Sequence, residues 1–142
     1  MPAHALVAIG PQDELLRLTG SAGNPYQDIT ATGAGTGKYY GVNRTVQLIP
    51  VVAGTVSGTN PTLDVKLQDS ADGVTYADMG ISFPQITASN AAATLSLSEI
   101  TGRRAVYTQT GRPWVREFHT IGGTATPTFN SFALLHETAL PF

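Results

Sequence analysis

The sequence Thr62-Leu63-Asp64-Val65-Lys66-Leu67-Gln68 alternates apolar and polar residues without a break. In a β-strand successive side chains point to opposite faces, so Leu63, Val65 and Leu67 share one face and the polar residues share the other. The pattern is typical of a strand with one buried face and one face in water. It predicts a β fold, and the rest of the chain can be compared with it.

Similar short runs recur between turn-forming residues, for which 15 Gly and 9 Pro provide the main signals. Further strands are predicted at residues 15–19, 44–49, 51–56, 75–79, 81–86, 94–98, 104–108, 114–121 and 128–136. Many short strands with turns between them indicate an antiparallel β-sandwich or a barrel. The best helical pattern, residues 12–18, would form one or two turns. The expected class is therefore all-β, in a single domain of residues 1–142 with its core at about 44–137.

Two details of this reading depend on backbone chemistry. Residues 44–49 and 51–56 are expected to pair around Pro50, which cannot donate to a ladder and so marks an edge or a bulge. The sequence Asp69-Ser70-Ala71-Asp72-Gly73 predicts a hairpin turn, in which Asp69 accepts backbone N–H groups and Gly73 supplies a positive φ. Other loops are expected at residues 57–61, 111–113 and 122–127.

The N-terminal region, about residues 1–43, differs from the rest because residues 20–41 are rich in Gly and poor in large apolar side chains. A structureless stretch of this length is uncommon inside a compact domain. We expect either a disordered segment or an extended arm that orders against a partner. On the second reading, removal of residues 1–41 should leave a folded domain that has lost its binding.

Composition excludes several function classes. Charged residues make up 13% of the chain, and 8 Lys and Arg stand against 10 Asp and Glu. Nucleic-acid binding, which needs an excess of cations, is therefore not expected. The absence of Cys excludes disulfides and thiolate chemistry. No apolar run reaches the roughly 18 residues of a membrane span. The N-terminal sequence lacks a secretory signal, so folding in the cytoplasm that made the chain is expected.

The candidate catalytic and metal sites lack the residues or the spacing that their chemistry requires. Gly33-Ala34-Gly35-Thr36-Gly37-Lys38 resembles a phosphate loop but lacks the first Gly and the final Ser or Thr of that motif. The acids Asp69, Asp72 and Asp78 lack calcium-loop spacing. His119 lies two residues after Glu117, which places both on one strand face, where a solvated contact is the usual arrangement. Neither these residues nor His4 and His136 supply a zinc ligand set. No enzyme activity, metal or cofactor is predicted.

The aromatic residues are better candidates for an interface. Trp114, flanked by Arg112 and Arg116, could be a core ring or an interface anchor, since Trp and Arg are favoured at binding hot spots. Large rings on a Gly-rich segment have little local core to join. The predicted interface residues are Tyr26, Tyr39, Tyr40, Trp114 and Arg116.

The hairpin sequence 63–78, followed by Arg112-Pro113-Trp114-Val115-Arg116 and a closing strand at 128–135, resembles the small capsid decoration proteins of tailed bacteriophages. The likeness covers about residues 44–136. It implies a jelly-roll-like sandwich that forms homodimers or homotrimers on the capsid exterior and cements the shell by bridging neighbouring major capsid proteins. It brings no catalytic residues. A phage tail, baseplate or fibre component and a carbohydrate-binding module remain as alternatives.

Overall fold

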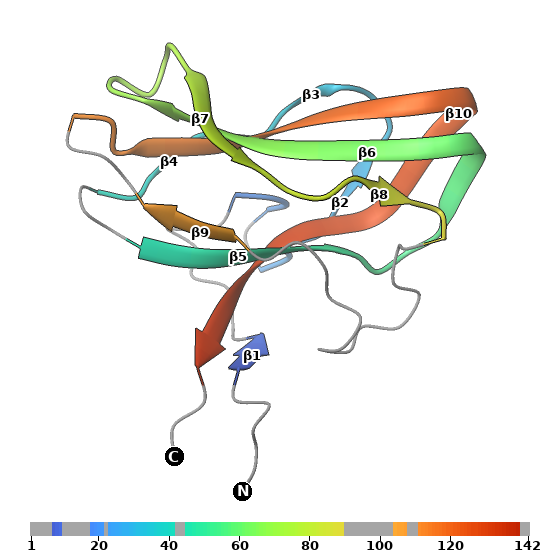
Figure 1. Cartoon of the computed structure of the whole chain (residues 1–142), viewed down its shortest axis with the longest axis horizontal. Coiled ribbons are helices and arrows are strands. Elements are labelled where there is room, and N and C mark those ends of the chain that lie inside the picture. Colours follow the sequence, from blue (N-terminus) through green and yellow to red (C-terminus); the bar gives the residue numbers. More distant parts are fainter. Residues whose placement is uncertain are drawn as a thin grey trace, which may run out of the picture.

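The computed structural model describes residues 7–9, 18–21, 23–41, 45–89, 104–107 and 111–139, and for 7–9, 45–47, 104–107 and 136–139 it describes the backbone alone. Every regular element in this part is a β-strand, and all pairings are antiparallel (Figure 1). The all-β antiparallel prediction is therefore confirmed. The weak helical pattern at 12–18 and the predicted strand at 94–98 lie outside the described residues, apart from Leu18.

One long, folded ribbon organises the molecule. Strands β5 (Thr45–Val52) and β6 (Val56–Ser70) follow each other in the chain, and both pair with the 26-residue strand β10 (Trp114–Ala139). The register runs from Trp114 opposite Ser70 to His136 opposite Leu48. The ribbon bends so that its β5 half lies beneath its β6 half, as Figure 1 shows.

The bend has a backbone cause. The register between β6 and β10 shifts between Gly122 and Thr128, and Gly123, Ala125 and Thr126 all have positive φ there. Bulges of this kind increase twist and turn a strand without ending it. The Gly- and Pro-rich segment 122–127 was predicted as a loop between two strands. The structure corrects this, because β10 continues through it and joins both predicted strands.

Four further strands extend the sheet. β7 (Ala77–Ser82) and β8 (Ile86–Thr87) pair with β6, β9 (Arg104–Tyr107) pairs with β5, and β1 (Val7–Ile9) pairs with the end of β10. The order is β7-β6-β10-β5-β9 within one hydrogen-bonded sheet. A sandwich of two separate sheets and a jelly-roll-like order therefore stay predictions, although the folded ribbon does give two layers (Figure 1).

Pro50 shows why a one-residue signal can mislead. The predicted strands 44–49 and 51–56 do not pair with each other, since β5 runs straight through Pro50 and pairs there with Leu134 of β10. The register of β9 on β5 ends at Leu48, so β5 has no second neighbour among the described strands at Pro50. The edge position predicted for Pro50 stays a prediction, whereas the predicted break in the strand is wrong.

The N-terminal segment is extended, as expected, but it orders against its own chain. β2 (Gln27–Ile29), β3 (Gly33–Ala34) and β4 (Lys38–Tyr39) all pair with β10, on the edge opposite to β5 and β6. Leu18, Ile29 and Tyr40 are buried in the main core. Removal of residues 1–41 would therefore strip core side chains, which corrects the expectation that the remainder folds alone.

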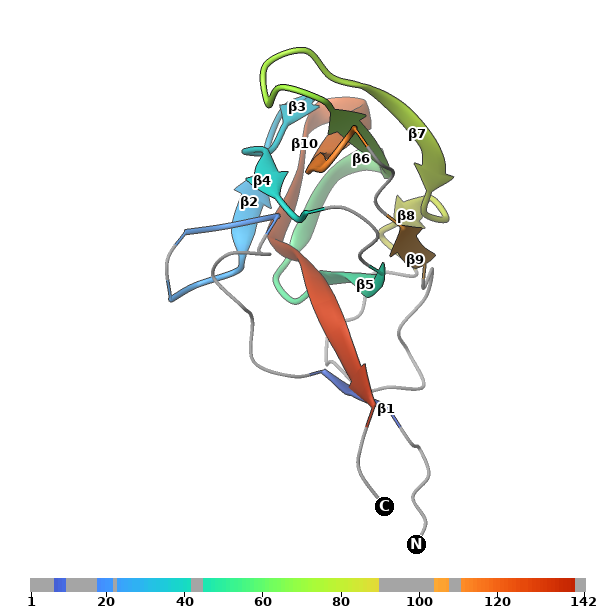
Figure 2. The same cartoon turned by 90° about the vertical axis from the view of Figure 1, so that its left-hand side faces the viewer.

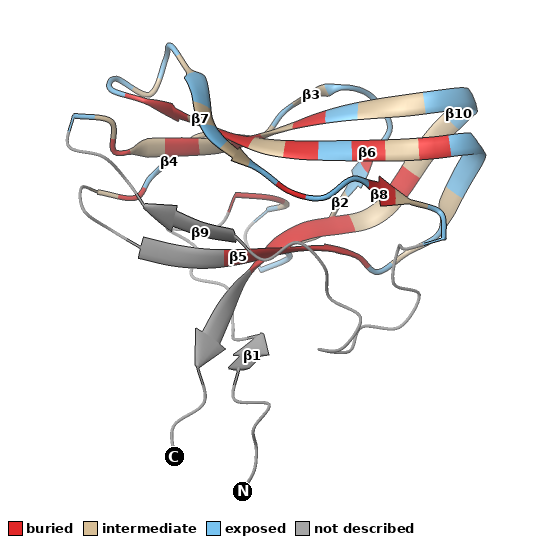
Figure 3. Cartoon of the chain, viewed as in Figure 1, coloured by how far each residue is buried: buried red, intermediate tan, exposed pale blue. Residues whose placement is uncertain are grey.

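The core lies between the two layers of the folded ribbon, and the buried positions alternate along β6 and β10 (Figure 3). A smaller buried group, Ile49, Val51, Ala133 and Leu135, lies on the other face of β5 and β10 and is covered in part by Tyr26. The main core also contains residues from the N-terminal segment and from the β7–β8 connection. Its buried members are Leu18, Ile29, Tyr40, Leu48, Val52, Leu63, Val65, Leu67, Phe83, Ile86, Val115, Phe129, Phe132 and Leu134.

Candidate interaction surface

The first half of β10 presents two chemically different faces. Its inner residues Val115, Glu117 and His119 are buried, whereas Trp114, Arg116 and Phe118 on the outer face are half-buried. The alternation is the ordinary period of a strand. Contacts between aromatic rings, and between rings and cations, gather on the outer face.

Trp114 anchors this face at the start of β10. The Tyr39 ring meets it edge-on, with ring centroids 5.4 Å apart and planes at 78°. Edge-to-face packing is the favoured geometry for aromatic pairs. On another side the Trp114 indole lies so close to Gly73 that an added Cβ there would be 2.9 Å from it. Gly73 therefore has two roles: it adopts the positive φ of 77° that the turn requires, and it leaves room for the indole.

Arg116 is held by two contacts. Its guanidinium carbon lies 4.2 Å from the centroid of the Tyr76 ring, and its Nε donates to Oε1 of Gln68 at 2.8 Å. The phenol of Tyr76 lies against Gly37, where no side chain would fit. Burial raises the pKa of Tyr76, while the charge of Arg116 acts in the opposite direction. The stack therefore joins β10 to the β6–β7 loop and to the N-terminal segment.

A second ring–cation contact lies farther along the same face. The Lys66 ammonium is 5.3 Å from the centroid of Phe118, and it donates to Asp78 Oδ2 at 2.9 Å. Gln68 Nε2 donates to the other Asp78 oxygen at 3.0 Å. Hydrogen bonds from Gln68 and Lys66 lower the pKa of Asp78. Because this pair is well exposed, its contribution to stability is small.

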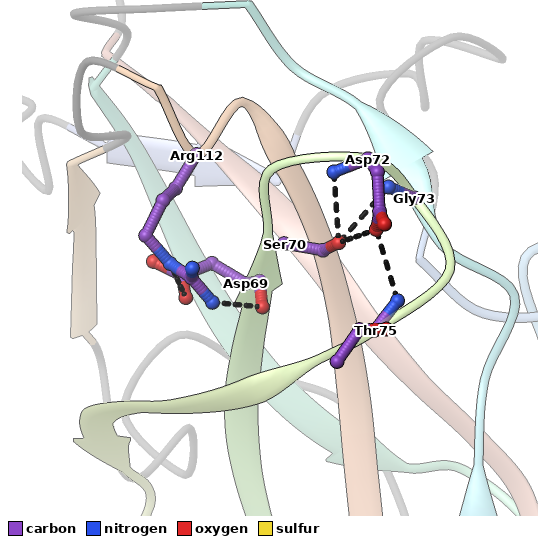
Figure 4. A network of polar contacts seen from close by, with 6 residues as sticks. All are labelled: Asp69, Ser70, Asp72, Gly73, Thr75 and Arg112. Atoms are coloured by element: carbon purple, nitrogen blue, oxygen red, sulfur yellow. Dashed lines mark hydrogen bonds and ion pairs between the residues drawn. The ribbon is translucent and has the colours of Figure 1, made fainter.

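The loop of residues 71–76 is organised by Ser70 and Asp72 (Figure 4). Ser70 Oγ accepts the N–H groups of Asp72 and Gly73, and Asp72 Oδ1 accepts those of Val74 and Thr75. The Asp72 carboxylate also accepts a hydrogen bond from Ser70 Oγ. The bonds that it accepts lower the pKa of Asp72 to about 2, and the N–H of Thr75 has the largest effect. The hairpin and the positive φ of Gly73 are confirmed.

The residue that caps this turn was predicted wrongly. Asp69 does not accept the loop N–H groups, because Arg112 engages it (Figure 4). The Arg112 Nε donates to Asp69 Oδ1 at 2.6 Å, and Nη2 donates to the Asp69 carbonyl oxygen at 2.8 Å. Asp69 is buried, and a buried carboxylate needs a charged or hydrogen-bonding partner. The ion pair ties the loop before β10 to the end of β6.

Two large apolar side chains in the described part are well exposed, and both belong to this end of the molecule. Tyr39 is 57% exposed and Val74 is 79% exposed. Trp114 connects them, since it contacts Tyr39 on one side and Gly73, the neighbour of Val74, on the other. We call the surface formed by Tyr39, Val74, Tyr76, Trp114 and Arg116 the aromatic tip. It lies where β4, the β6–β7 loop and the start of β10 meet (Figures 1 and 2).

The predicted interface residues divide between this surface and the interior. Tyr39, Trp114 and Arg116 come together in the aromatic tip, whereas Tyr40 is 2% exposed in the main core and Tyr26 packs on the smaller buried group. The prediction of Tyr40 as an interface residue is therefore wrong, because its side chain is buried in the main core. Sequence reasoning missed Tyr76 and Val74. Their position directly after the predicted hairpin turn was the available signal, because such residues are held at the end of two strands.

The inner face holds a buried ionisable pair. Glu117 is fully buried, and both of its carboxylate oxygens lie 2.9–3.0 Å from Nδ1 of His119, which is also buried. The strand face shared by the two residues is confirmed, but a solvated contact was the wrong expectation. Gly35 covers the pair: its N–H donates to the Glu117 carbonyl oxygen, and an added Cβ would be 2.8 Å from Glu117 Oε1. The glycine leaves space for the carboxylate.

The phosphate-loop-like segment and the three acids considered as a calcium site have structural roles in the described part of the chain. Residues 33–38 form extended pairings with β10 through β3 and β4, so they do not cradle a phosphate. Asp69, Asp72 and Asp78 bind three separate sets of groups, and no cluster of three metal-ligating side chains occurs in the described part. Near the ribbon bend lies an open pocket of about 480 Å³, and none of the described residues that line it is ionisable. Its lining residues are Gly58, Asn60, Pro61, Thr62, Thr87, Ala88 and Ser89.

Comparison with protein families and with curated sequences finds no relative of the chain. No protein-family model matches the chain, and no curated protein sequence is significantly similar to it. Among the described residues, no helix is long and apolar enough to cross a membrane. The geometry of the aromatic tip is therefore the principal guide to function.

Proposed function

We propose that this chain is a structural virion protein that decorates the exterior of a bacteriophage capsid and cements it by bridging neighbouring major capsid proteins. It acts through surface contact and not through catalysis. The observation that carries this proposal is the aromatic tip, in which exposed Tyr39 and Val74 flank a half-buried Trp114. Trp, Tyr and Arg are the residues enriched at protein–protein hot spots.

The aromatic tip is also fixed before any partner arrives. The Ser70 and Asp72 hydrogen bonds hold the loop, Arg112 ties the start of β10 to Asp69, and Arg116 stacks on Tyr76. A surface whose side chains are already ordered loses less conformational entropy on binding. Contacts that are individually weak can then hold a shell together when many copies bind at once.

The ring geometry favours a protein partner over a glycan. A carbohydrate-binding surface needs open ring faces on which sugars stack, but the Tyr76 face is occupied by Arg116 and Phe118 is approached by Lys66. Tyr39 presents its edge to Trp114 at 78° and does not form a coplanar row with it. These rings support packing against side chains more readily than against a flat sugar.

Self-association would use the opposite end of the molecule. β1 pairs with residues Glu137–Ala139 of β10, and Figures 1 and 2 show this pair projecting from the rest of the sheet. No other described strand pairs with β1. A two-stranded ribbon is marginally stable alone, and its backbone edges can accept further strands. We propose that sister subunits pair here, in a homodimer or homotrimer.

The test uses empty capsids of the phage that encodes the chain. We expect the purified chain to sediment with capsids and to appear as extra density on their exterior by cryo-electron microscopy. Tyr39→Ala combined with Val74→Ser should weaken binding at least tenfold, while Thr124→Ala, an exposed change near the ribbon bend, should not. Absence of the wild-type chain from capsids would overturn the proposal, and density on the tail would support a tail component instead.

A further inference from the structure

The aromatic tip contains one cation whose hydrogen-bonding capacity is only partly used. The Arg116 Nε is bonded to Gln68, and the face of its guanidinium lies on Tyr76. The two terminal nitrogens make no hydrogen bond or ion pair within the described part of the chain. A guanidinium offers paired N–H donors that match a carboxylate in a two-point contact.

Arg116 differs in this respect from its neighbours Lys66 and Arg112. Lys66 holds Asp78 at 2.9 Å, and Arg112 holds the buried Asp69 at 2.6 Å. Asp72, the acid of the adjacent loop, directs its Oδ1 to the loop donors Ser70, Val74 and Thr75. The nearby carboxylates are thus engaged elsewhere, whereas Arg116 is half-buried and lacks one. A partly dehydrated cation gains when an anion completes its contacts.

The surroundings of Arg116 define what else the partner must present. Trp114 precedes it by two residues on the same strand face, and the exposed Tyr39 and Val74 lie beyond. A matching surface therefore combines an anionic group with an apolar side chain. The chain's net charge of −2 disfavours a polyanion such as DNA, which would need many cations.

We infer that the partner binds the aromatic tip through a protein segment that carries an Asp or Glu carboxylate for Arg116 next to an apolar side chain that covers Tyr39 and Val74. This inference rests on the proposed function and specifies the chemistry of the capsid surface at that contact. Arg116 would be the ion-pairing residue, and the stack on Tyr76 would orient it. The Nε bond to Gln68 would leave both terminal nitrogens directed to the carboxylate.

The experiment measures capsid affinity as a function of salt. Wild-type binding should weaken as NaCl is raised from 50 to 500 mM, because an exposed ion pair is screened. Arg116→Gln should weaken low-salt binding by about tenfold to a hundredfold, in the range of a lost charged hydrogen bond, and should remove most of the salt dependence. Arg116→Lys should restore only part of the affinity, since Lys cannot make the two-point contact.

The outcomes separate this inference from the proposed function. If the wild-type chain binds capsids and Arg116→Gln binds with the same affinity and salt dependence, the carboxylate contact is wrong and the decoration role stands. If the wild-type chain binds no capsid, the proposed function itself fails. Salt-sensitive binding to duplex DNA that Arg116→Gln abolishes would assign the site to phosphate and overturn the inference. Thermal unfolding checks that each variant is folded. The salt series on the wild-type chain tests the ionic contact even if a variant fails to fold.

Discussion

The two faces of β10 between Trp114 and His119 use the same backbone for opposite purposes. On the inner face, Glu117 and His119 form a buried, hydrogen-bonded pair that the N-terminal segment covers. On the outer face, Arg116 stacks on Tyr76 and remains within reach of a partner. The same strand therefore holds one ionisable pair inside the fold and one cation at its surface.

The largest expected effect comes from breaking the covered pair. Glu117→Ala should lower the free energy of unfolding by about 3–5 kcal/mol, because it leaves His119 buried without its partner and opens a cavity. Urea denaturation followed by Trp114 fluorescence measures the change. Replacing both residues by Leu should recover much of the loss. A loss below about 1 kcal/mol for Glu117→Ala would show that the pair is not effectively buried.

A smaller loss is expected when the cover over this pair is disturbed. Gly35→Ala would place a Cβ 2.8 Å from Glu117 Oε1 and 2.9 Å from the Leu18 carbonyl oxygen. Such overpacking costs about 1–3 kcal/mol. Gly33→Ala is the matched control, since its Cβ would lie 3.7 Å from His119 Nε2, an ordinary contact distance. Equal melting temperatures for the two variants would contradict this account of the cover.

On the outer face, stability should respond much less. Arg116→Gln removes the stack on Tyr76, worth about 0.5–1 kcal/mol, and the hydrogen bond from Nε to Gln68, worth about 1 kcal/mol. The same change is expected to reduce capsid binding strongly, so stability and binding separate at this residue. Parallel denaturation and binding measurements provide the test. A loss of several kcal/mol would make Arg116 a structural residue and remove the contrast between the faces.

The smallest effect is confined to acid. The pKa of Asp72 is about 2 in the folded chain, below its ordinary value of 3.8, because loop N–H groups bind the carboxylate. A lowered pKa gives stability that is present above about pH 4 and is lost as the pH falls toward 2. NMR shifts of Val74 and Thr75 should follow this titration. Asp72→Asn should keep an acceptor for the loop and abolish the pH dependence; a midpoint near 4 would contradict the network.

Part of this structure could be predicted from local sequence. The alternation at residues 62–68 lies within β6, and the turn chemistry placed the hairpin and the positive φ of Gly73 correctly. Strand periodicity also placed Glu117 and His119 on one face. These features depend on residues close together in the chain, where steric preference and side-chain direction act directly.

The errors concern features that distant segments decide. Gly35 indicated flexibility, but its lack of a side chain makes room for a carboxylate more than eighty residues away in the chain. Tyr40 seemed to have no core to join because that core is formed by β6, β10 and other remote strands. Residues 122–127 carry loop chemistry, yet hydrogen bonding to β6 resumes on both sides of the shift. Local propensity cannot reveal such partners.

The folded ribbon also has a consequence for how the chain acquires its structure. Ser70 pairs with Trp114 at one end and Leu48 with His136 at the other, so every rung joins residues that are synthesised far apart. Loop-closure entropy makes such non-local pairing slow. On the ribosome, β5 and β6 emerge well before β10 and remain without this main neighbour until translation nears its end. The ribbon can therefore close only after the final quarter of the polypeptide has been made. A product truncated before β10 would expose the unpaired backbone edges of β5 and β6.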